Sequence, residues 1–276
     1  MKLLKPLLRP LALALGWAWA FWGAALYFGH RSAVRLAYGM SFLDIFFLRG
    51  NRQALMVHTL FAIGMFGALV AFFFTPEPKE EDPPSGKLSL NLVLTALALP
   101  LLLVLPAVLL SALSNFANFS DFSRGLLKVL LYFFSTLFTF SAGELFWQGR
   151  IYPILKHRLP LFRLSMLVGA FRFVWYLPVA ILIYLDFDKH SNLPGLLCFV
   201  FGVFALSYIL TYLYRMSDSM ALVILTHALI MTANFAFTVF FPYSFFAFLP
   251  GLTAWGAVWY WERRRRAEKG LRPKNS

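Results

Sequence analysis

Charged residues are scarce in this chain, and their scarcity argues against a soluble fold. Only 13% of the 276 residues are Asp, Glu, Lys or Arg, whereas 60% are hydrophobic and 18% are aromatic. A soluble globular domain carries about 25% charged residues. We therefore expect the lipid bilayer, rather than water, to be the main solvent of this protein.

Cysteine is nearly absent. Cys198 is the only one, so an intrachain disulfide and a cysteine-rich zinc site are both excluded. The sequence also has no HExxH motif, no cluster of His, Cys and carboxylate residues, no phosphate-binding loop and no serine nucleophile elbow. We expect neither a dedicated metal site nor a cofactor.

Acidic residues are also few. The chain has 12 Asp and Glu against 25 Lys and Arg, which gives a formal net charge of +13. In a soluble protein this excess would suggest nucleic-acid binding. Here the basic residues lie mostly between hydrophobic runs and at the two ends, and none of them forms a module long enough to fold alone. We expect contact with membrane lipids and no nucleic-acid partner.

Eight hydrophobic runs each approach the roughly 20 residues that cross a bilayer as a helix. They predict an all-α polytopic bundle of about eight spanning helices, which forms a single membrane-embedded domain over residues 1–276. The first run is long and lacks a small-x-small cleavage pattern, so we interpret it as a retained helix. The runs are Leu11–Phe28, Ala54–Phe74, Leu88–Leu113, Leu126–Trp147, Leu164–Leu185, Leu196–Tyr214, Met220–Phe241 and Ser244–Trp261.

The distribution of Lys and Arg predicts the orientation. With eight crossings, the side that holds both termini carries most basic residues, including Arg263–Arg266, so we expect both termini in the cytoplasm, and the composition suits a bacterial plasma membrane. The basic, aromatic stretch His30–Gln53 opposes this orientation. It is typical of an amphipathic segment on the membrane surface, or of a substrate gate. The polar, acidic and proline-rich stretch Thr75–Gly86 predicts an exposed loop.

Ionisable residues inside the hydrophobic runs are functional candidates, because each is costly in a bilayer unless it is paired. Glu144 lies near the cytoplasmic end of the fourth run. Arg172 and His227 lie in the fifth and seventh runs, which enter from the same side, at a depth of roughly 10–12 Å. We therefore expect these three residues to meet in the cytoplasmic half of the bundle. His58 stands alone in the second run, where we expect a hydrogen bond to a neighbouring helix.

Three further polar residues lie on the same helix faces as this trio, at spacings of four or seven residues. The pairs are Glu144 with Gln148, Arg172 with Tyr176, and His227 with Asn234. Such a cluster supports two interpretations. A carboxylate and a histidine could activate a water for amide hydrolysis. Alternatively, Glu144 and Arg172 could form a buried ion pair that, with the other polar groups, fixes helix packing.

Three segments between Leu126 and Phe237 resemble the motifs of the CAAX protease and bacteriocin-processing family, also called CPBP or Abi, in order and separation. Gly143–Gly149 is similar to its Glu-Glu-x-x-x-Arg-Gly motif, and Phe171–Pro178 to a Phe-x-x-x-His segment followed by Leu-Pro. Tyr214–Leu229 is similar to a serine-containing turn before a helix that bears His and, four residues later, Asn. The resemblance implies a bundle of about eight helices and an intramembrane endopeptidase, a hydrolase in which glutamate activates water, with residues 126–237 as its core.

The chain departs from this family at the positions that the resemblance implies are catalytic. Glu144 and His227 are retained, but five other key positions differ. Gly143 replaces the first glutamate, Gln148 the arginine, Arg172 the phenylalanine, Tyr176 the second-motif histidine and Met231 the asparagine. Glycine cannot accept a proton, and a methionine side chain cannot stabilise an oxyanion by hydrogen bonding.

Two interpretations follow from these departures. In the first, the chain is a pseudoenzyme that binds a membrane-tethered peptide, a lipid or a partner membrane protein in an intramembrane cavity. In the second, the catalytic site is rebuilt. Glu144 would then be the base, His227 its partner, Tyr176 or Asn234 the oxyanion donor, and Arg172 or Arg150 the substitute for the motif arginine. We favour the first interpretation, because the second requires several coordinated replacements.

A third class is a non-enzymatic subunit of a membrane transport or assembly complex. A transporter should show inverted repeats or paired broken helices, and the sequence shows no such symmetry. An interaction subunit should present an aromatic outer surface. The phenylalanine-rich segments Phe133–Phe140 and Phe235–Phe248 could form that surface, or could simply contact lipid.

Overall fold

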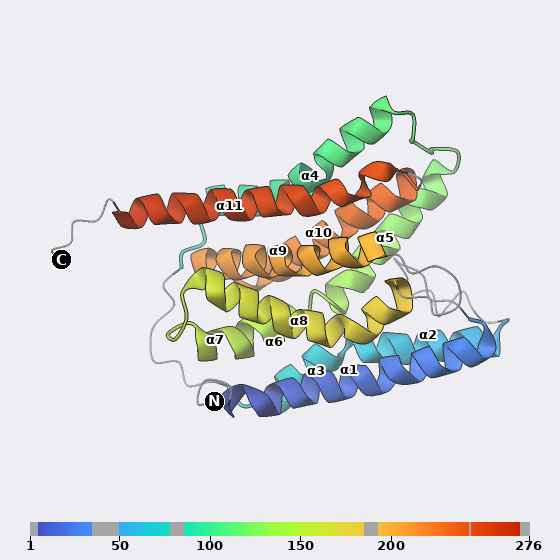
Figure 1. Ribbon diagram of the computed structural model, residues 1–276, viewed down its shortest axis with the longest axis horizontal. Helices are drawn as coiled ribbons and strands as arrows, with labels where there is room; N and C mark the ends of the chain where they lie inside the picture. The colour runs from blue at the N-terminus through green and yellow to red at the C-terminus, as the bar shows by residue number, and fades with distance from the viewer. Residues whose placement is uncertain (1–4, 35–49, 78–85, 185–192, 243, 271–276) are drawn as a thin grey trace.

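The computed structural model describes residues 5–34, 50–77, 86–184, 193–242 and 244–270. Within these ranges every regular element is a helix and no strand occurs, so the predicted all-α class is confirmed. The long helices lie side by side and run broadly along one direction (Figure 1). This arrangement gives a bundle with two ends and an outer flank between them.

Eleven α-helices and two other helical turns follow one another along the described residues. In order they are α1 (Lys5–Ser32), α2 (Arg52–Met65), α3 (Gly67–Phe74), α4 (Leu90–Leu113), α5 (Phe122–Phe138), α6 (Glu144–Phe146), the π-helical turn η2 (Trp147–Ile151), α7 (Tyr152–Leu155), α8 (Leu161–Tyr184), α9 (Leu193–Ser217), α10 (Met220–Phe240), the 3₁₀ turn η3 (Phe245–Phe248) and α11 (Leu249–Gly270). Each of the eight predicted runs contains helix. Successive long helices run in alternate directions, and α1 begins at the end of the bundle where α11 finishes (Figure 1).

Five helices are long and apolar enough to cross a membrane: Pro6–Ser32, Leu90–Leu113, Leu161–Ile181, Gly195–Ser217 and Met220–Phe240. Together, α2 and α3 form a sixth candidate, bent by 41°. Helix α5 is shorter, with 17 residues, and α11 carries Glu262 and four arginines in its second half. The chain is therefore an integral membrane protein by the composition and length of its helices.

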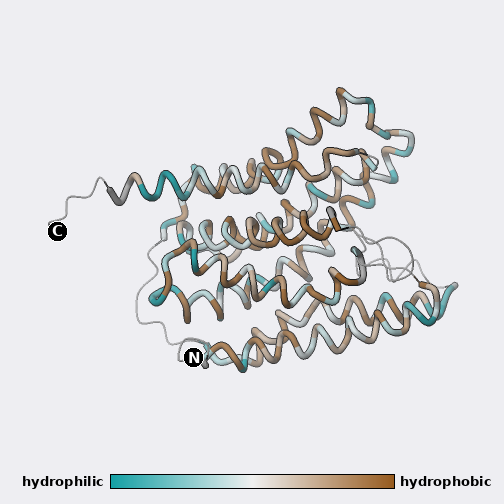
Figure 2. Tube along the Cα trace, viewed as in Figure 1, coloured by the Kyte–Doolittle hydropathy of each residue, from teal (hydrophilic) through white to brown (hydrophobic). Residues whose placement is uncertain are grey.

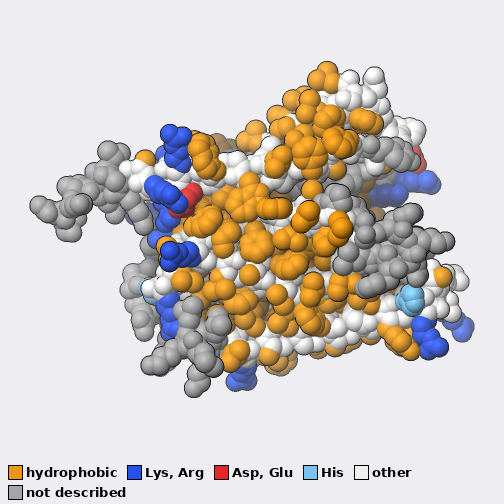
Figure 3. Space-filling view, viewed as in Figure 1, with side chains coloured by type: hydrophobic (Ala, Val, Ile, Leu, Met, Phe, Trp, Pro, Cys, Tyr) orange, Lys and Arg blue, Asp and Glu red, His pale blue; other side chains and the backbone are white. Residues whose placement is uncertain are grey.

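The outer flank is hydrophobic, whereas the basic residues gather toward the two ends (Figures 2 and 3). Helix α4 is an example: the side chains of Leu94, Leu101 and Leu105 are 55%, 68% and 45% exposed. In water such a surface would be unfavourable, but lipid tails solvate it. Charged ends on either side of an apolar belt are what a bilayer and its headgroups require.

The interior near α1 is built around large aromatic side chains. Trp22, Trp147 and Trp175 are all buried in one cluster, and the Trp22 and Trp175 ring centroids are 5.0 Å apart. The Trp22 indole lies so close to Gly64 in α2 that a Cβ there would be 2.4 Å from the ring. Only glycine lets the two helices approach this closely, which is a common device for packing helices in membranes.

Two sequence predictions fall largely outside the described residues. The surface segment predicted for His30–Gln53 includes residues 35–49, and the loop predicted for Thr75–Gly86 includes residues 78–85, neither of which the structure describes. The structure does describe Gly86, the last residue of the second stretch, and Lys87, which follows it. The Lys87 amide donates a 3.1 Å hydrogen bond to the Met216 carbonyl, which places the start of the segment before α4 against the end of α9.

Candidate functional site

A break in the chain after α5 places Glu144 inside the bundle. The Thr139 hydroxyl donates to the Ser135 carbonyl at 2.8 Å, and α5 ends one residue before Thr139. The backbone then makes tight turns, in which the amide of Glu144 donates to the Ser141 carbonyl at 3.0 Å. Glu144 therefore begins a new helical segment, α6, after this break.

The segment that follows Glu144 contains a π-helical turn. This turn, η2, spans Trp147–Ile151 and lies between α6 and α7. It carries Gln148 and Gly149, the end of the Gly143–Gly149 segment that resembles the first motif, and also Arg150. Single π-helical turns occur frequently at functional sites, because they shift the side chains after them by about one residue relative to an α-helix.

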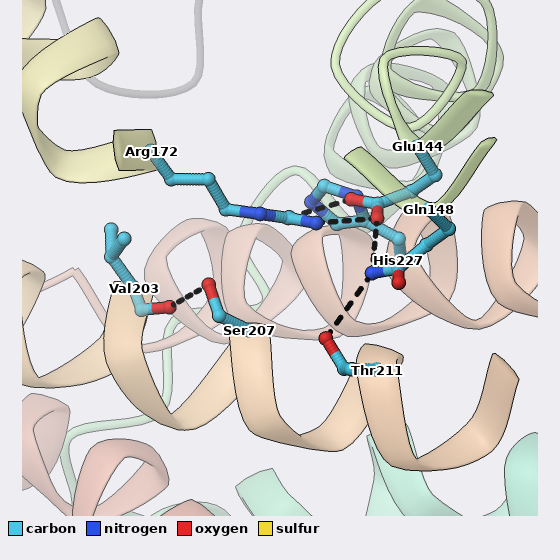
Figure 4. Close-up of polar contacts among 7 residues, drawn as sticks. All are labelled: Glu144, Gln148, Arg172, Val203, Ser207, Thr211 and His227. Carbon is cyan, nitrogen blue, oxygen red and sulfur yellow. Dashed lines mark hydrogen bonds and ion pairs between the residues drawn. The ribbon is translucent and has the colours of Figure 1, made fainter. Parts of the chain in front are cut away.

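Arg172 of α8 binds the Glu144 carboxylate with both ends of its guanidinium group. Its Nη1 atom donates to Oε1 at 2.6 Å and its Nη2 atom donates to Oε2 at 2.5 Å (Figure 4). The guanidinium also lies over the Trp147 ring, with Cζ 5.4 Å from the ring centroid. Bidentate pairs of this kind are the strongest and most directional contacts that a carboxylate makes with a side chain.

His227 and Gln148 complete the surroundings of the carboxylate. His227 of α10 places Nδ1 2.8 Å from Glu144 Oε1, although the direction of approach does not meet hydrogen-bond geometry. The Gln148 amide donates to Glu144 Oε2 at 3.3 Å and to the Thr211 hydroxyl of α9 at 3.4 Å. The four elements α6, α8, α9 and α10, together with η2, therefore meet at one polar centre (Figure 4).

This polar centre is closed to the surroundings. Glu144, Gln148 and Thr211 are 0% exposed, His227 is 1% exposed and Arg172 is 2% exposed. Glutamate and arginine offset each other's charge, which reduces the cost of placing either one in an apolar interior. Four polar atoms of this centre have no hydrogen-bond partner among the described residues: Gln148 Oε1, Arg172 Nε and both ring nitrogens of His227.

The predicted meeting of Glu144, Arg172, Gln148 and His227 is confirmed. The other two candidate residues make their contacts elsewhere. The Tyr176 ring stacks on Trp22 with centroids 6.3 Å apart and an interplanar angle of 12°, and it also packs on Phe140. The Asn234 amide donates to the Ile230 carbonyl of its own helix at 2.9 Å. Neither side chain is hydrogen-bonded to the carboxylate.

Of the two arginines considered as substitutes for the motif arginine, only Arg172 reaches Glu144. Arg150 lies over the Phe72 ring of α3, with Cζ 4.1 Å from the centroid, and its Nη1 is 3.7 Å from a carboxylate oxygen of Glu77. Thr211 was missed by sequence reasoning. A lone threonine in an apolar helix gives little signal, because its hydroxyl commonly bonds to its own backbone, as the nearby Ser207 hydroxyl does with the Val203 carbonyl (Figure 4).

Gly143, which precedes Glu144 and which the sequence resemblance would align with a glutamate, is tightly enclosed. A Cβ atom at this position would lie 3.0 Å from the Phe140 carbonyl oxygen and 3.3 Å from the Ala68 Cβ of α3. The site therefore has little space for a larger residue unless α3 moves. Within the described part of the chain, no group of three or more His, Cys, Asp or Glu side chains could hold a metal ion.

No family model and no curated protein matches this chain. The geometry of the polar centre is therefore the main guide to function.

Proposed function

We propose that this chain is a non-catalytic membrane protein of the CPBP/Abi type, in which Glu144 holds helices together instead of activating water. The observation that carries the proposal is the bidentate contact between Arg172 and Glu144, with distances of 2.6 and 2.5 Å. A general base must have a lone pair free to accept a proton from water. In this protein both carboxylate oxygens of Glu144 already accept hydrogen bonds, from Arg172 and, at Oε2, also from Gln148.

The replacements around Glu144 support the same conclusion. Gly143 has no side chain to act as a base, and the enclosure by Phe140 and Ala68 leaves little room for a water in place of that side chain. Tyr176 is held in an aromatic stack and Asn234 bonds its own helix, so neither is aimed at a reacting carbonyl. A protease would need at least one such donor to stabilise the oxyanion.

In this proposal the protein acts by binding. A bundle related to an intramembrane peptidase would keep the ability to receive a membrane-tethered peptide, a lipid or a partner membrane protein between its helices. The polar centre would fix how the helices pack, because a buried ion pair with good geometry specifies how α6, α8 and α10 meet.

The test compares wild-type protein with Glu144→Gln and His227→Ala in membranes that carry a panel of membrane-tethered peptides. We expect no cleavage by any of the three proteins. Glu144→Gln should also be less stable, because it leaves the buried Arg172 charge unpaired, so cleavage is compared only after the folding and expression of each variant have been checked. Crosslinking in the same membranes, followed by mass spectrometry, should identify a bound peptide, lipid or protein. Wild-type cleavage that disappears in both variants would overturn the proposal.

One contact favours an alternative function, an active endopeptidase with a rebuilt site. His227 Nδ1 lies 2.8 Å from Glu144 Oε1, which is the separation of a carboxylate–histidine pair. Arg172 would have to release the carboxylate when substrate enters. The alternative predicts that Arg172→Gln retains or increases cleavage, whereas the non-catalytic proposal predicts no cleavage with or without Arg172.

We also propose eight membrane crossings, with both termini on the cytoplasmic side of a bacterial plasma membrane. The alternating helices and the shared end of α1 and α11 support an even number of crossings (Figure 1). The concentration of arginines at the end of α11 supports the cytoplasmic assignment. Reporter fusions to each terminus test this: a periplasmic signal from either one would contradict it.

A further inference from the structure

The last turns of α11 are anchored to α9 by a small polar cluster that is separate from Glu144. Glu262 is 8% exposed and accepts a 3.0 Å hydrogen bond from the Tyr208 hydroxyl of α9. Arg265 donates to both oxygens of the same carboxylate, at 2.7 and 3.1 Å. The end of α11 is therefore held in one orientation, with Arg265 committed to an internal contact.

Most of the other side chains on this stretch of α11 face outward, whereas Trp261 stacks on Tyr212 of α9 with ring centroids 4.8 Å apart. Trp259 and Tyr260 are 62% and 55% exposed. The Arg263 guanidinium lies over the Trp259 ring, with Cζ 5.3 Å from the centroid. Arg266 also faces outward: its side chain is 75% exposed, and its Nε donates a 3.3 Å hydrogen bond to Glu262. Trp259 and Tyr260 thus lie about one helical turn from the Arg263 guanidinium group and about two turns from that of Arg266.

This order along the helix matches the layers of a membrane surface. Trp and Tyr are typical of the boundary between lipid tails and headgroups, and cations beyond them reach the phosphate layer. Basic side chains gather at this end of the bundle (Figure 3). They include Arg215, which is exposed in the last turn of α9, the helix against which α11 packs. Glu262 offsets only part of the positive charge that Arg263–Arg266 carry.

We propose that residues 259–266 form a binding surface for the headgroups of anionic phospholipids. Trp259 would lie at the base of the headgroup with Arg263 held over its ring, and Arg263 and Arg266 would bind the phosphate. Arg265 and Glu262 position the surface and do not contact the lipid. An exposed aromatic pair beside the hydrophobic flank favours a lipid over an acidic soluble protein. At the boundary of the bilayer, lipid can contact Trp259 and Tyr260, whereas a soluble partner would not reach them.

The test is native mass spectrometry of the full-length protein in detergent with phosphatidylglycerol and phosphatidylcholine. The variant is Arg263→Gln with Arg266→Gln. The matched control is Arg124→Gln with Lys128→Gln, which removes two exposed cations from α5 near the opposite end of the bundle (Figure 1). All three proteins should melt at similar temperatures, because the contacts of Glu262 with Tyr208 and Arg265 are unchanged.

We expect wild-type protein to retain phosphatidylglycerol in preference to phosphatidylcholine. The α11 variant should bind phosphatidylglycerol about 30-fold more weakly, and the α5 control should stay within about 2-fold of wild type. The proposal is overturned if wild type shows no preference for the anionic lipid, or if the α11 variant binds phosphatidylglycerol as tightly as wild type does. It is also overturned if the α5 control loses as much affinity for phosphatidylglycerol as the α11 variant.

Discussion

Arg172 and Glu144, 28 residues apart in the chain, share two hydrogen bonds in the centre of the bundle. An ion pair with this geometry has a particular energetic signature. Desolvation of the two ions offsets much of their attraction, so the pair as a whole contributes modestly, whereas the loss of one partner leaves a buried charge without compensation.

The first prediction concerns this asymmetry. Arg172→Leu alone should lower the free energy of unfolding by about 3–5 kcal/mol, because the Glu144 charge is left unpaired. The double variant Glu144→Leu with Arg172→Leu should recover most of that loss. Unfolding in mixed micelles measures both. Additive losses in the double variant would show that the two side chains do not act as a pair.

The second prediction concerns the position before Glu144. Gly143→Glu reintroduces the glutamate expected from the family resemblance, yet we predict no cleavage activity and a lower melting temperature. A side chain there would press on the Phe140 carbonyl and on Ala68, and a second carboxylate would lie beside Glu144.

Two glycine-to-alanine variants separate the crowding from the charge. Gly143→Ala should cost about 1–3 kcal/mol, the range for overpacking. Gly149→Ala is the matched control, because its Cβ would meet the Phe72 ring at an ordinary 3.4 Å. Cleavage by Gly143→Glu that disappears when Glu144 is also changed would instead show that the site can be restored.

The third prediction concerns the contact between α8 and α9. Gly169 lies against Phe204, and an added Cβ would be 2.8 Å from Cδ1 and 3.3 Å from Cα of that residue. Gly169→Ala should therefore destabilise the protein by about 1–3 kcal/mol. Gly202→Ala, two residues from Phe204, meets nothing within 4 Å and should be neutral or stabilising. Thermal melting in detergent would contradict this account if the two variants behaved alike.

The fourth prediction concerns pH and the end of α11. Burial raises the pKa of the Glu262 carboxyl, but the hydrogen bonds from Arg265 and Tyr208 outweigh burial and lower that pKa below its ordinary value of 4.5. A lowered carboxyl pKa contributes stability that is fully present above the ordinary value and is lost as the pH falls through the folded value.

Wild type should therefore melt higher than Glu262→Gln at pH 7, by an amount that stays constant to about pH 5 and shrinks below about pH 4. Tyr208→Phe removes one hydrogen bond and leaves the arginine contacts intact. We therefore expect the difference in melting temperature between wild type and Tyr208→Phe to depend less on pH than the difference between wild type and Glu262→Gln. A difference between wild type and Glu262→Gln that stays constant down to pH 3 would contradict the role of the Glu262 charge.

Much of the fold could be predicted from hydrophobicity alone, because lipid imposes a simple length rule on helices. Each predicted run contains helix, and the meeting of Glu144, Arg172 and His227 followed from alternating helix directions. The breaks could not be predicted this way. The fourth run, Leu126–Trp147, was taken as one helix, but the chain leaves the helical path between Phe138 and Glu144. Turns at this depth form only because neighbouring helices enclose them.

The side-chain partners were harder to predict than the positions of the helices. A spacing of four residues places Tyr176 on the same helix face as Arg172, but a face is wide, and the tyrosine ring instead packs against Trp22 of α1. Asn234 had a competing partner in the Ile230 carbonyl, one turn earlier on its own helix. The Tyr176 contact cannot be read from spacing, because it depends on where α1 lies in three dimensions. The Asn234 contact lies within α10, and spacing alone does not decide whether such an amide bonds its own helix or a neighbouring one.

The polar centre also bears on how the protein is made. Glu144 leaves the ribosome 28 residues before Arg172, a delay of about 1–6 seconds at ordinary rates of synthesis. During that interval the Glu144 carboxyl group lacks the cation that offsets its charge in the folded protein. We therefore expect the insertion of α6 to be coupled to that of α8, while His227 of α10 follows later in the chain.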